Sequence, residues 1–541
     1  MSLEPAFFTV DHGSASTAAA LIVRVGERYR LLAFGAQPSS IPVEPLLAGL
    51  AADVRGIDAG LLADAGGPAL GWRRIESATR KPPRAVVGGT SAAAKAAEAA
   101  LVSSGWCVLG RVGPDRAGAG AATEHCLDPE LGLIVLAASD PLGKGEREEF
   151  ADVVALVAAA LARRDDAVDV LLVGGAASAG EAVGRGRVLR GPGAAADPTA
   201  APDGLRAILE ALAVERPDGE DGAPPLPDGR RGLVASAWSL AVRLDRRVEL
   251  VDIGVGAGLR ALAEPRGLIG WYASADAALV PGEAIDDDRR ADQVLEWSTI
   301  QADQSTLRDR VRNLALAPWR GVSGDGARLR LAAARAALSR LDAEWRLPDE
   351  DGRPADESAD LLIASGGAFA VAPAPAVALA LLDTLRRPGA RALALDHARI
   401  LGPLGGMDDE AERGRLLDDL FEEALLPLGS VIVATGIRSG RHRDALRLTT
   451  AGGASSQVEL VPGGVQLVDL PPGVTATAEL ATKDGASLGV RSRHLAVSVV
   501  GGLGGLLVDT REFPLRLPDR LERRRDILDA WQRPMWAGWD T

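Results

Sequence analysis

Two apolar runs in this chain end in Asp-x-Gly, and this repeated pattern constrains the fold more than any other feature. The first is AFFTVDHGSAST, residues 6–17, and the second is VELVDIGVGAG, residues 248–258. Each predicts a strand that ends in a sharp turn, because glycine adopts turn conformations without steric cost. Two further runs, TAAALIVRVG and RYRLLAFGA, follow the first. We therefore expect the chain to begin with three short antiparallel strands.

The glycines at positions 254, 256 and 258 leave three interpretations of the second run. An acid followed by Gly-x-Gly-x-Gly is typical of S-adenosylmethionine methyltransferases. The same glycines can present bare N–H groups to a phosphate, or they can form an ordinary tight turn. By analogy with dinucleotide folds, a methyltransferase needs an acid for the ribose about 20 residues further on. Only Asp276 is available there, after a turn of small residues, so the methyltransferase is the least favoured interpretation.

Strand and helix patterns alternate through residues 84–174, which predicts an α/β layer structure with parallel strands. The strand DVLLVGG in this region resembles DLLIASGG, which begins at residue 360. Each half of the chain thus has an early strand ending in Asp-x-Gly and a later strand ending in Gly-Gly, which indicates a weak internal repeat. From about residue 430 short alternating runs predict β-structure.

Composition narrows the class of protein. A chain of 541 residues is longer than one hydrophobic core usually organises, so two to four domains are expected. A net charge of −14 argues against a general binder of nucleic acid or anionic membranes, which need a basic field. The first residues lack a signal-peptide pattern, and glycines and prolines interrupt the most apolar segment. We expect a cytoplasmic protein in which Cys107 and Cys126 are reduced thiols.

Two Asp-x-Gly turns on separate halves can face each other across a cleft and bind a polyphosphate between them. Asp11 and Asp252 would hold a hydrated magnesium ion, while the turns donate N–H and O–H groups to phosphate oxygens. The glycine pair Gly366 and Gly367 would let a base or ribose lie against the backbone, because a side chain there would collide with it.

The ordered set FFTVDHGSAST, DVLLVGG, VELVDIGVGAG, DLLIASGGAF and VVGGLGGLLVDTREFPLRLP resembles the glutamate mutase L family, the MutL or GlmL proteins encoded beside cobalamin-dependent mutases. The resemblance covers nearly the whole chain and implies the actin, sugar kinase and Hsp70 (ASKHA) superfamily. It implies an α/β, two-lobed actin-like ATPase (ribonuclease H-like) fold with a C-terminal mainly β domain. The expected divisions are 1–240, the first lobe with an inserted α/β region and a linker; 241–430, the second lobe with a helical insertion; and 431–541, the β-rich domain with a terminal helix.

The resemblance also implies ATP or ADP with magnesium as the ligand. The residues it assigns to the nucleotide are Asp11, Gly13, Ser14, Thr17, Asp252, Gly254, Gly256, Gly366 and Gly367, with Asp11 and Asp252 toward the metal. The sequence departs from the family at both phosphate motifs. Ala15 and Ala18 replace a threonine and a lysine in the first motif, and Ala257, Gly258 and Leu259 replace two threonines and an aspartate in the second. His12 is also a departure, and we expect no catalytic role for it.

Loss of preorganised groups from a phosphoryl-transfer site slows the reaction by orders of magnitude, so we expect weak or absent hydrolysis. The resemblance implies a nucleotide-binding accessory or chaperone-like protein that assists a cobalamin-dependent mutase. The alternative is a degenerate, non-hydrolysing binding or scaffold protein of the same fold.

Overall fold

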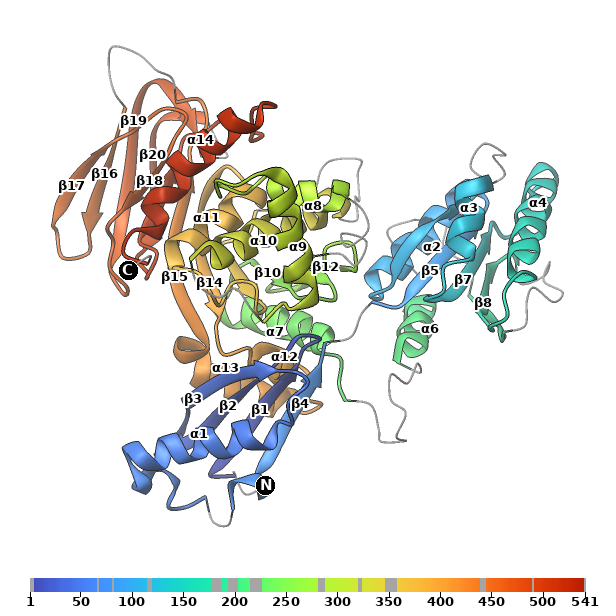
Figure 1. Ribbon diagram of the computed structural model, residues 1–541, viewed down its shortest axis with the longest axis horizontal. Helices are drawn as coiled ribbons and strands as arrows, with labels where there is room; N and C mark the ends of the chain where they lie inside the picture. Colours follow the sequence, from blue (N-terminus) through green and yellow to red (C-terminus); the bar gives the residue numbers. More distant parts are fainter. Residues whose placement is uncertain are drawn as a thin grey trace.

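The computed structural model describes residues 4–65, 68–79, 82–113, 119–176, 186–192, 203–214, 226–280, 288–319, 324–345, 358–437, 444–488 and 491–539. Figure 1 shows two lobes with helices between them, a separate α/β unit to one side and a β-rich C-terminal part. Among the described helices, none combines the length and the apolar character needed to span a bilayer.

The first lobe is built on a four-stranded sheet of order β3-β2-β1-β4. Strands β1 and β2 are antiparallel, as are β2 and β3, while β4 runs parallel to β1. Phe8 and Val10 of β1 pack with α1 on one face, and Phe7 packs with α7 and α12 on the other. The run is apolar throughout because the sheet is covered on both faces. The bounds are β1 Ala6–His12, β2 Ser16–Val25, β3 Arg28–Pro38, α1 Glu44–Ile57, η1 Ala59–Leu62, η2 Ala69–Gly71 and β4 Arg73–Ala78.

The second lobe repeats this strand pattern within an eight-stranded sheet of order β12-β11-β10-β13-β14-β15-β21-β18. Strands β10, β11 and β12 form an antiparallel meander, and β13 and β14 run parallel to β10. Both lobes thus have the ribonuclease H-like strand order, which confirms the predicted two-lobed α/β fold. The bounds are α7 Gly229–Leu244, β10 Val248–Ile253, β11 Gly258–Glu264, β12 Gly267–Ser274, α8 Asp288–Leu295, α9 Gln304–Leu316, α10 Gly324–Glu344, β13 Leu361–Ser365, α11 Ala374–Thr384, β14 Gly389–Asp396, α12 Leu401–Gly405, α13 Glu410–Ala424 and β15 Leu425–Val433.

The separate unit contains a five-stranded, wholly parallel sheet of order β6-β5-β7-β8-β9. The chain leaves the first lobe at Ala78 and returns at Asp228, and these two residues form a parallel β-bridge. The N–H of Ala78 also donates to the carbonyl of Pro227 at 3.0 Å. The unit is therefore inserted at one point of the first lobe. The bounds are β5 Arg84–Gly89, α2 Ser91–Ser103, β6 Cys107–Val112, α3 Ala119–Cys126, β7 Leu131–Ala138, α4 Lys144–Leu161, β8 Asp169–Gly174, β9 Val188–Gly191 and α6 Asp203–Val214.

This arrangement corrects one half of the predicted internal repeat. The DVLLVGG strand, β8, lies in the inserted sheet, whereas the DLLIASGG strand, β13, pairs directly with β10. The first-lobe counterpart of β13 is β4, because it alone runs parallel beside β1. The similarity of the two Gly-Gly strands is therefore local, since both are buried parallel strands.

The C-terminal part is mainly β, as predicted, and is divided between two sheets. Strands β17, β16, β19 and β20 form a sheet of their own, while β18 and β21 join the second-lobe sheet. Similarly, α13 lies in the range predicted for the second lobe but contacts β3, where Asp419 and Glu423 accept the N–H groups of Tyr29 and Leu31 at 3.0 and 2.7 Å. The residue limits of the three predicted domains stay a prediction. The bounds are β16 Ala445–Thr450, β17 Ser455–Glu459, β18 Val465–Val468, β19 Thr475–Ser487, β20 Arg491–Val500, β21 Leu506–Asp509, α14 Leu521–Gln532 and η5 Arg533–Trp536.

Candidate functional site

The two Asp-x-Gly turns have the same backbone geometry. The N–H of Gly13 donates to the carbonyl of Ser16 at 3.1 Å, and that of Gly254 donates to Ala257 at 3.0 Å. Each turn joins the first two strands of its lobe, β1 to β2 and β10 to β11. This half of the predicted internal repeat is therefore present in the structure, with one turn at the same position in each lobe.

Residues of the two turns lie close together although they come from different lobes. A Cβ on Gly367 would lie 3.8 Å from Ser16 Oγ of the first turn. A Cβ on Gly366 would lie 2.8 Å from Asp252 Oδ1 and 2.5 Å from the carbonyl of Ile253. Gly366 also has a φ of +96°, so both its space and its backbone conformation require glycine. The Gly-Gly turn after β13 thus lies against both Asp-x-Gly turns.

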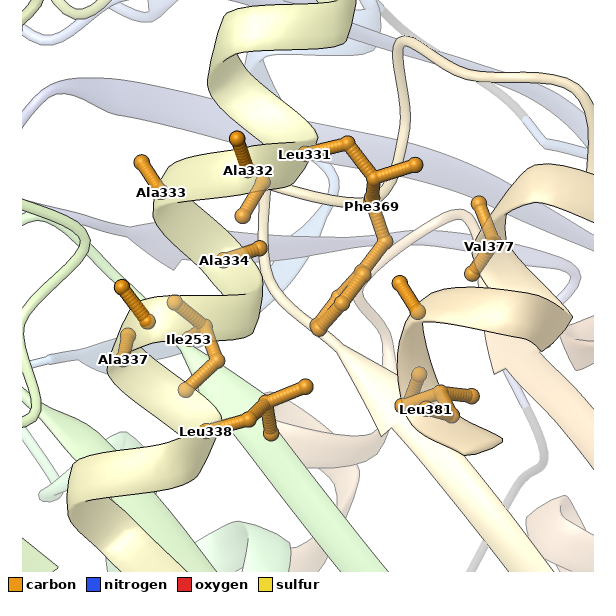
Figure 2. Packing of buried hydrophobic residues seen from close by; sticks show 14 of the residues in the cluster. Ile253, Leu331, Ala332, Ala333, Ala334, Ala337, Leu338, Phe369, Val377 and Leu381 are labelled. Atoms are coloured by element: carbon orange, nitrogen blue, oxygen red, sulfur yellow. The ribbon is translucent and has the colours of Figure 1, made fainter. Parts of the chain in front are cut away.

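The cluster in Figure 2 holds this part of the backbone in place. Ile253, next to Asp252, packs against Ala337 and Leu338 of α10, and Phe369, two residues after the glycine pair, reaches between α10 and α11. Ile253 and Phe369 are fully buried. Because side chains in a close-packed core have little freedom, these two anchors position the second turn and the Gly-Gly turn relative to each other.

The other predicted residues differ in how they face the site. Ser14 is exposed at the tip of the first turn, and its carbonyl accepts a hydrogen bond from Ser39 Oγ at 3.0 Å. Thr17 is buried in β2 opposite His12. Gly254 and Gly256 lie in the second turn. The assignment of all nine residues to a nucleotide stays a prediction, and the structure brings Asp11, Gly13, Asp252, Gly366 and Gly367 into one neighbourhood.

Arg399 joins the two lobes at this point, and the sequence analysis missed it. It follows β14, and its Nε donates to Asp11 Oδ2 at 2.7 Å. Its Nη1 donates to Ser16 Oγ at 2.8 Å, and its Nη2 donates to the carbonyls of Asp11 and Ser16 at 3.2 and 3.0 Å. No local motif marks this arginine, because its partners lie more than 380 positions away in the chain.

Two buried carboxyls beside this arginine are partly protonated at neutral pH. Burial, together with the nearby charge of Asp11, raises the pKa of Asp252 to about 7. Burial likewise raises the pKa of Asp396 to about 7, even though the N–H groups of Ile400 and Leu401 donate to it. Ser365 donates to Asp396 at 3.2 Å. The site therefore combines one strongly paired carboxylate with two carboxyls whose charge depends on pH.

The carboxyl groups are a poor fit to a directly bound magnesium ion. Mg²⁺ requires ionised oxygen ligands in octahedral geometry. Oδ2 of Asp11 is instead engaged by Arg399. Within the described part of the chain, no group of three or more His, Cys, Asp or Glu side chains is placed to hold a metal ion. Magnesium at Asp11 and Asp252 stays a prediction that these contacts do not favour.

The side chain of His12 contacts the neighbouring strand β4. Its Nε2 lies 3.3 Å from Oε2 of Glu76 on β4, and this hydrogen bond lowers the pKa of Glu76. His12 thus has a partner within the first-lobe sheet, and its lack of a catalytic role stays a prediction.

The methyltransferase interpretation of Gly254, Gly256 and Gly258 is wrong. In a nucleotide fold of the dinucleotide type, the glycine turn connects a strand to a helix whose N-terminus faces the ligand. Here β10 leads into the antiparallel strand β11. Gly258 belongs to that strand, where a Cβ would lie 2.6 Å from the carbonyl of Ala277, so this glycine serves close packing.

No family model matches this chain, and no curated protein matches its sequence. Solved structures with a similar arrangement include acetone carboxylase, 12% identical over 84% of this chain and 80% of that one, with a TM-score of 0.25. Component A of the Acidaminococcus fermentans (R)-2-hydroxyglutaryl-CoA dehydratase is 10% identical over 74% of this chain and 95% of that one, with a TM-score of 0.24. A chain of the PilM–PilN type IV pilus biogenesis complex is 14% identical over 78% and 98%, with a TM-score of 0.21. Likenesses this weak carry no argument about function. The strand order of its own two sheets identifies the chain as a two-lobed α/β protein of the actin-like type.

Proposed function

We propose that this chain binds an adenine nucleotide, ATP or ADP, between its lobes and works as an accessory protein with weak or absent hydrolysis. One observation carries the proposal: two turns with the same internal hydrogen bond, one from each lobe, meet at a glycine pair, where a Cβ on Gly367 would lie 3.8 Å from Ser16 Oγ. The N–H groups of Gly13 and Gly254 are used within the turns, and the other N–H groups of such turns can face an anion. Closure of the two lobes over the nucleotide would serve as the switch.

The side chains of the two turns are consistent with slow nucleotide hydrolysis, because they provide few groups that could contact a transferred phosphate. The second turn, Val255-Gly256-Ala257, offers no hydroxyl group. In the first turn Ser16 accepts a hydrogen bond from Arg399, and Thr17 is buried. Phosphoryl transfer depends on preorganised groups around the transferred phosphate, and each missing group costs orders of magnitude in rate.

The test is titration of the full chain with ATP and ADP by calorimetry, alongside a phosphate-release assay. Asp11→Ala and Asp252→Ala should each weaken binding, and together they should be non-additive, because both residues belong to one site. Asp53→Ala on the exposed side of α1 removes the same charge and should leave binding unchanged. Wild-type protein that binds neither nucleotide would disprove the proposal, and rapid phosphate release would disprove its second part.

A cobalamin-dependent mutase as the partner rests only on the resemblance to glutamate mutase L. Affinity purification of the tagged full chain, with and without nucleotide, tests it. We expect a mutase subunit to co-purify in a nucleotide-dependent way. One observation favours the scaffold alternative, because Arg399 already donates to the hydroxyl and the carbonyl of Ser16 in the first turn. The scaffold alternative predicts that the partner co-purifies with or without nucleotide.

A further inference from the structure

Arg399 is a buried charged residue with an unfavourable backbone conformation. Its side chain is only 11% exposed, and its backbone φ is +55°, a left-handed conformation that an arginine rarely adopts. Such strain persists only where the surroundings fix it, and it concentrates at functional sites. The residue therefore reaches Asp11 from the other lobe at an energetic cost to the backbone.

A cation at this point has a definite electrostatic role. Asp11 is the carboxylate paired with Arg399, and, although burial opposes this, its charge raises the pKa of the guanidinium. An anionic nucleotide would be repelled by the ionised Asp11 unless a cation lay between them. A positive charge between the carboxylates and the phosphates is required for binding, and in nucleotide sites that charge is usually a divalent metal ion.

We propose that Arg399 is the resident cation of this site: its guanidinium neutralises Asp11 in place of a divalent metal ion and binds a phosphate of the nucleotide. This inference rests on the proposed nucleotide-binding function. It follows from the poor fit of the carboxyls to a metal and from the direct pairing of Asp11 Oδ2 with Arg399 Nε at 2.7 Å.

The donors of Arg399 leave room for a ligand on one side. A guanidinium has five N–H donors. Nε makes one hydrogen bond to Asp11, Nη2 makes two to backbone carbonyls, and Nη1 makes one to Ser16 Oγ. Among the residues that the structure describes, the second N–H of Nη1 has no acceptor, and Nη1 lies 3.9 Å from the position of a Cβ on Gly367. The available donor is thus beside the glycine pair predicted to lie along the nucleotide, where its bond to a phosphate oxygen would be charge-assisted.

The inference predicts how metal and arginine compete. A divalent cation at Asp11 would lie beside the guanidinium charge that already contacts Oδ2 of this carboxylate, so the two cations repel each other. Wild-type protein should therefore bind ADP equally well in excess EDTA and in saturating magnesium. Once Arg399 is removed, Asp11 is free, and magnesium should become able to substitute for the lost charge.

The experiment is calorimetric titration of the full chain with ADP in those two conditions. Arg399→Gln should weaken binding in EDTA by about 10- to 100-fold, which corresponds to the loss of one charge-assisted hydrogen bond. Magnesium should restore part of the affinity of Arg399→Gln but none of the affinity of Asp11→Asn/Arg399→Gln. Arg415→Gln, an exposed arginine on α13, is the matched control and should bind as wild type does. A strict magnesium requirement in wild type, with Arg399→Gln unaffected, would overturn the inference.

A second measurement separates this inference from the proposed function. Titration with Mn²⁺, followed by electron paramagnetic resonance without nucleotide, asks only whether Asp11 is available to a metal. Wild type should bind no Mn²⁺ at Asp11. Arg399→Gln should bind one more Mn²⁺ ion than wild type, and the double variant Asp11→Asn/Arg399→Gln should not bind this additional ion. If wild type binds no nucleotide, the proposed function fails while this result still decides the role of Arg399. Mn²⁺ bound by wild type, or none bound by a folded Arg399→Gln, would refute the role, with folding checked by near-ultraviolet circular dichroism.

Discussion

At the scale of single residues, the sequence predicts those parts of the site that carry a local signal. Asp11 and Asp252 each lie near the end of an apolar strand, two residues before a glycine. The structure places Asp252 beside Gly366, and it links Asp11 to the same place through Arg399, whose Nη1 lies near Gly367. Arg399 could not be predicted, because its place depends on the packing of two lobes and no neighbouring residue marks it. Thr17 has a hydroxyl that fits a phosphate motif, but strand β2 buries this residue, and its role toward a nucleotide stays a prediction.

The raised pKa of Asp252 gives a prediction with a definite sign. The folded-state pKa, about 7, lies above the ordinary value of 3.8, so the folded protein binds this proton more tightly than the unfolded chain. Stability is therefore lost as pH rises between these values and is constant above them. Asp252→Asn removes the charge and should be more stable than wild type at about pH 8, by at most about 4 kcal/mol, with the difference vanishing toward about pH 4.

Urea denaturation of both proteins across this pH range measures the effect. The difference between the variant and wild type isolates Asp252, because all other titrating groups are shared. An advantage of Asp252→Asn that stayed constant with pH would show that Asp252 is ionised throughout.

At the scale of elements, several glycines allow two backbone segments to pack closely. The sequence shows that these glycines are present, but it does not show which segments they bring together. Helices α7 and α12 cross between the lobes (Figure 1), and a Cβ on Gly232 of α7 would lie 1.9 Å from the carbonyl of Gly402. The glycine run near the C-terminus is similar, since Cβ atoms on Gly501 and Gly502 would lie 2.1 and 2.3 Å from backbone atoms of Pro471 and Gly429. The run that gave the sequence much of its family resemblance thus serves strand packing, which only the folded chain reveals.

Gly232→Ala should destabilise the protein by about 1–3 kcal/mol or more, because overpacking forces the two helices apart. The matched control is Gly49→Ala on α1, where nothing lies within 4 Å of the added Cβ. That change should be neutral or stabilising by up to about 1 kcal/mol, since alanine favours helices. Chemical denaturation measures the free energy of unfolding of both variants. Equal changes would contradict the close packing of α7 against α12 at Gly232.

A buried ionic network fixes the C-terminal strand to the second lobe. Arg511 donates to Asp509 at 2.9 and 3.0 Å and to Asp383 of α11 at 2.7 Å, and all three side chains are almost fully buried. Arg511→Met should cost about 3–5 kcal/mol, because it leaves buried carboxylates with fewer partners. Arg310→Met breaks an exposed pair with Asp325 in the same lobe and should cost at most about 1 kcal/mol. Urea denaturation distinguishes the two, and a small effect of Arg511→Met would show that Arg335 and Arg386, which also donate to Asp383 and Asp509, are sufficient partners.

At the scale of the whole molecule, the chain is an actin-like pair of lobes interrupted by a unit with its own core. The sequence predicts an inserted α/β region, because strand and helix periodicities alternate along it. It cannot predict that the insertion begins and ends at one point, which depends on the bridge between Ala78 and Asp228. The inserted sheet buries apolar side chains on both faces, separately from the lobes. The unit therefore has what an independently stable domain requires.

A chain in which a short Gly-Ser linker replaces residues 80–226 should fold and bind ADP with the affinity of the full chain. Its ends are already adjacent, and the site lies in the two lobes. The main cost is exposure of Trp271, whose ring packs against Gly105 of the inserted unit, so the shortened chain should carry Trp271→Gln. The same substitution in the full chain is the control. Cooperative urea unfolding and ADP titration measure the outcome. If the shortened chain folds but no longer binds ADP, while the control does, the inserted unit contributes to the site, and the two lobes alone do not hold the nucleotide.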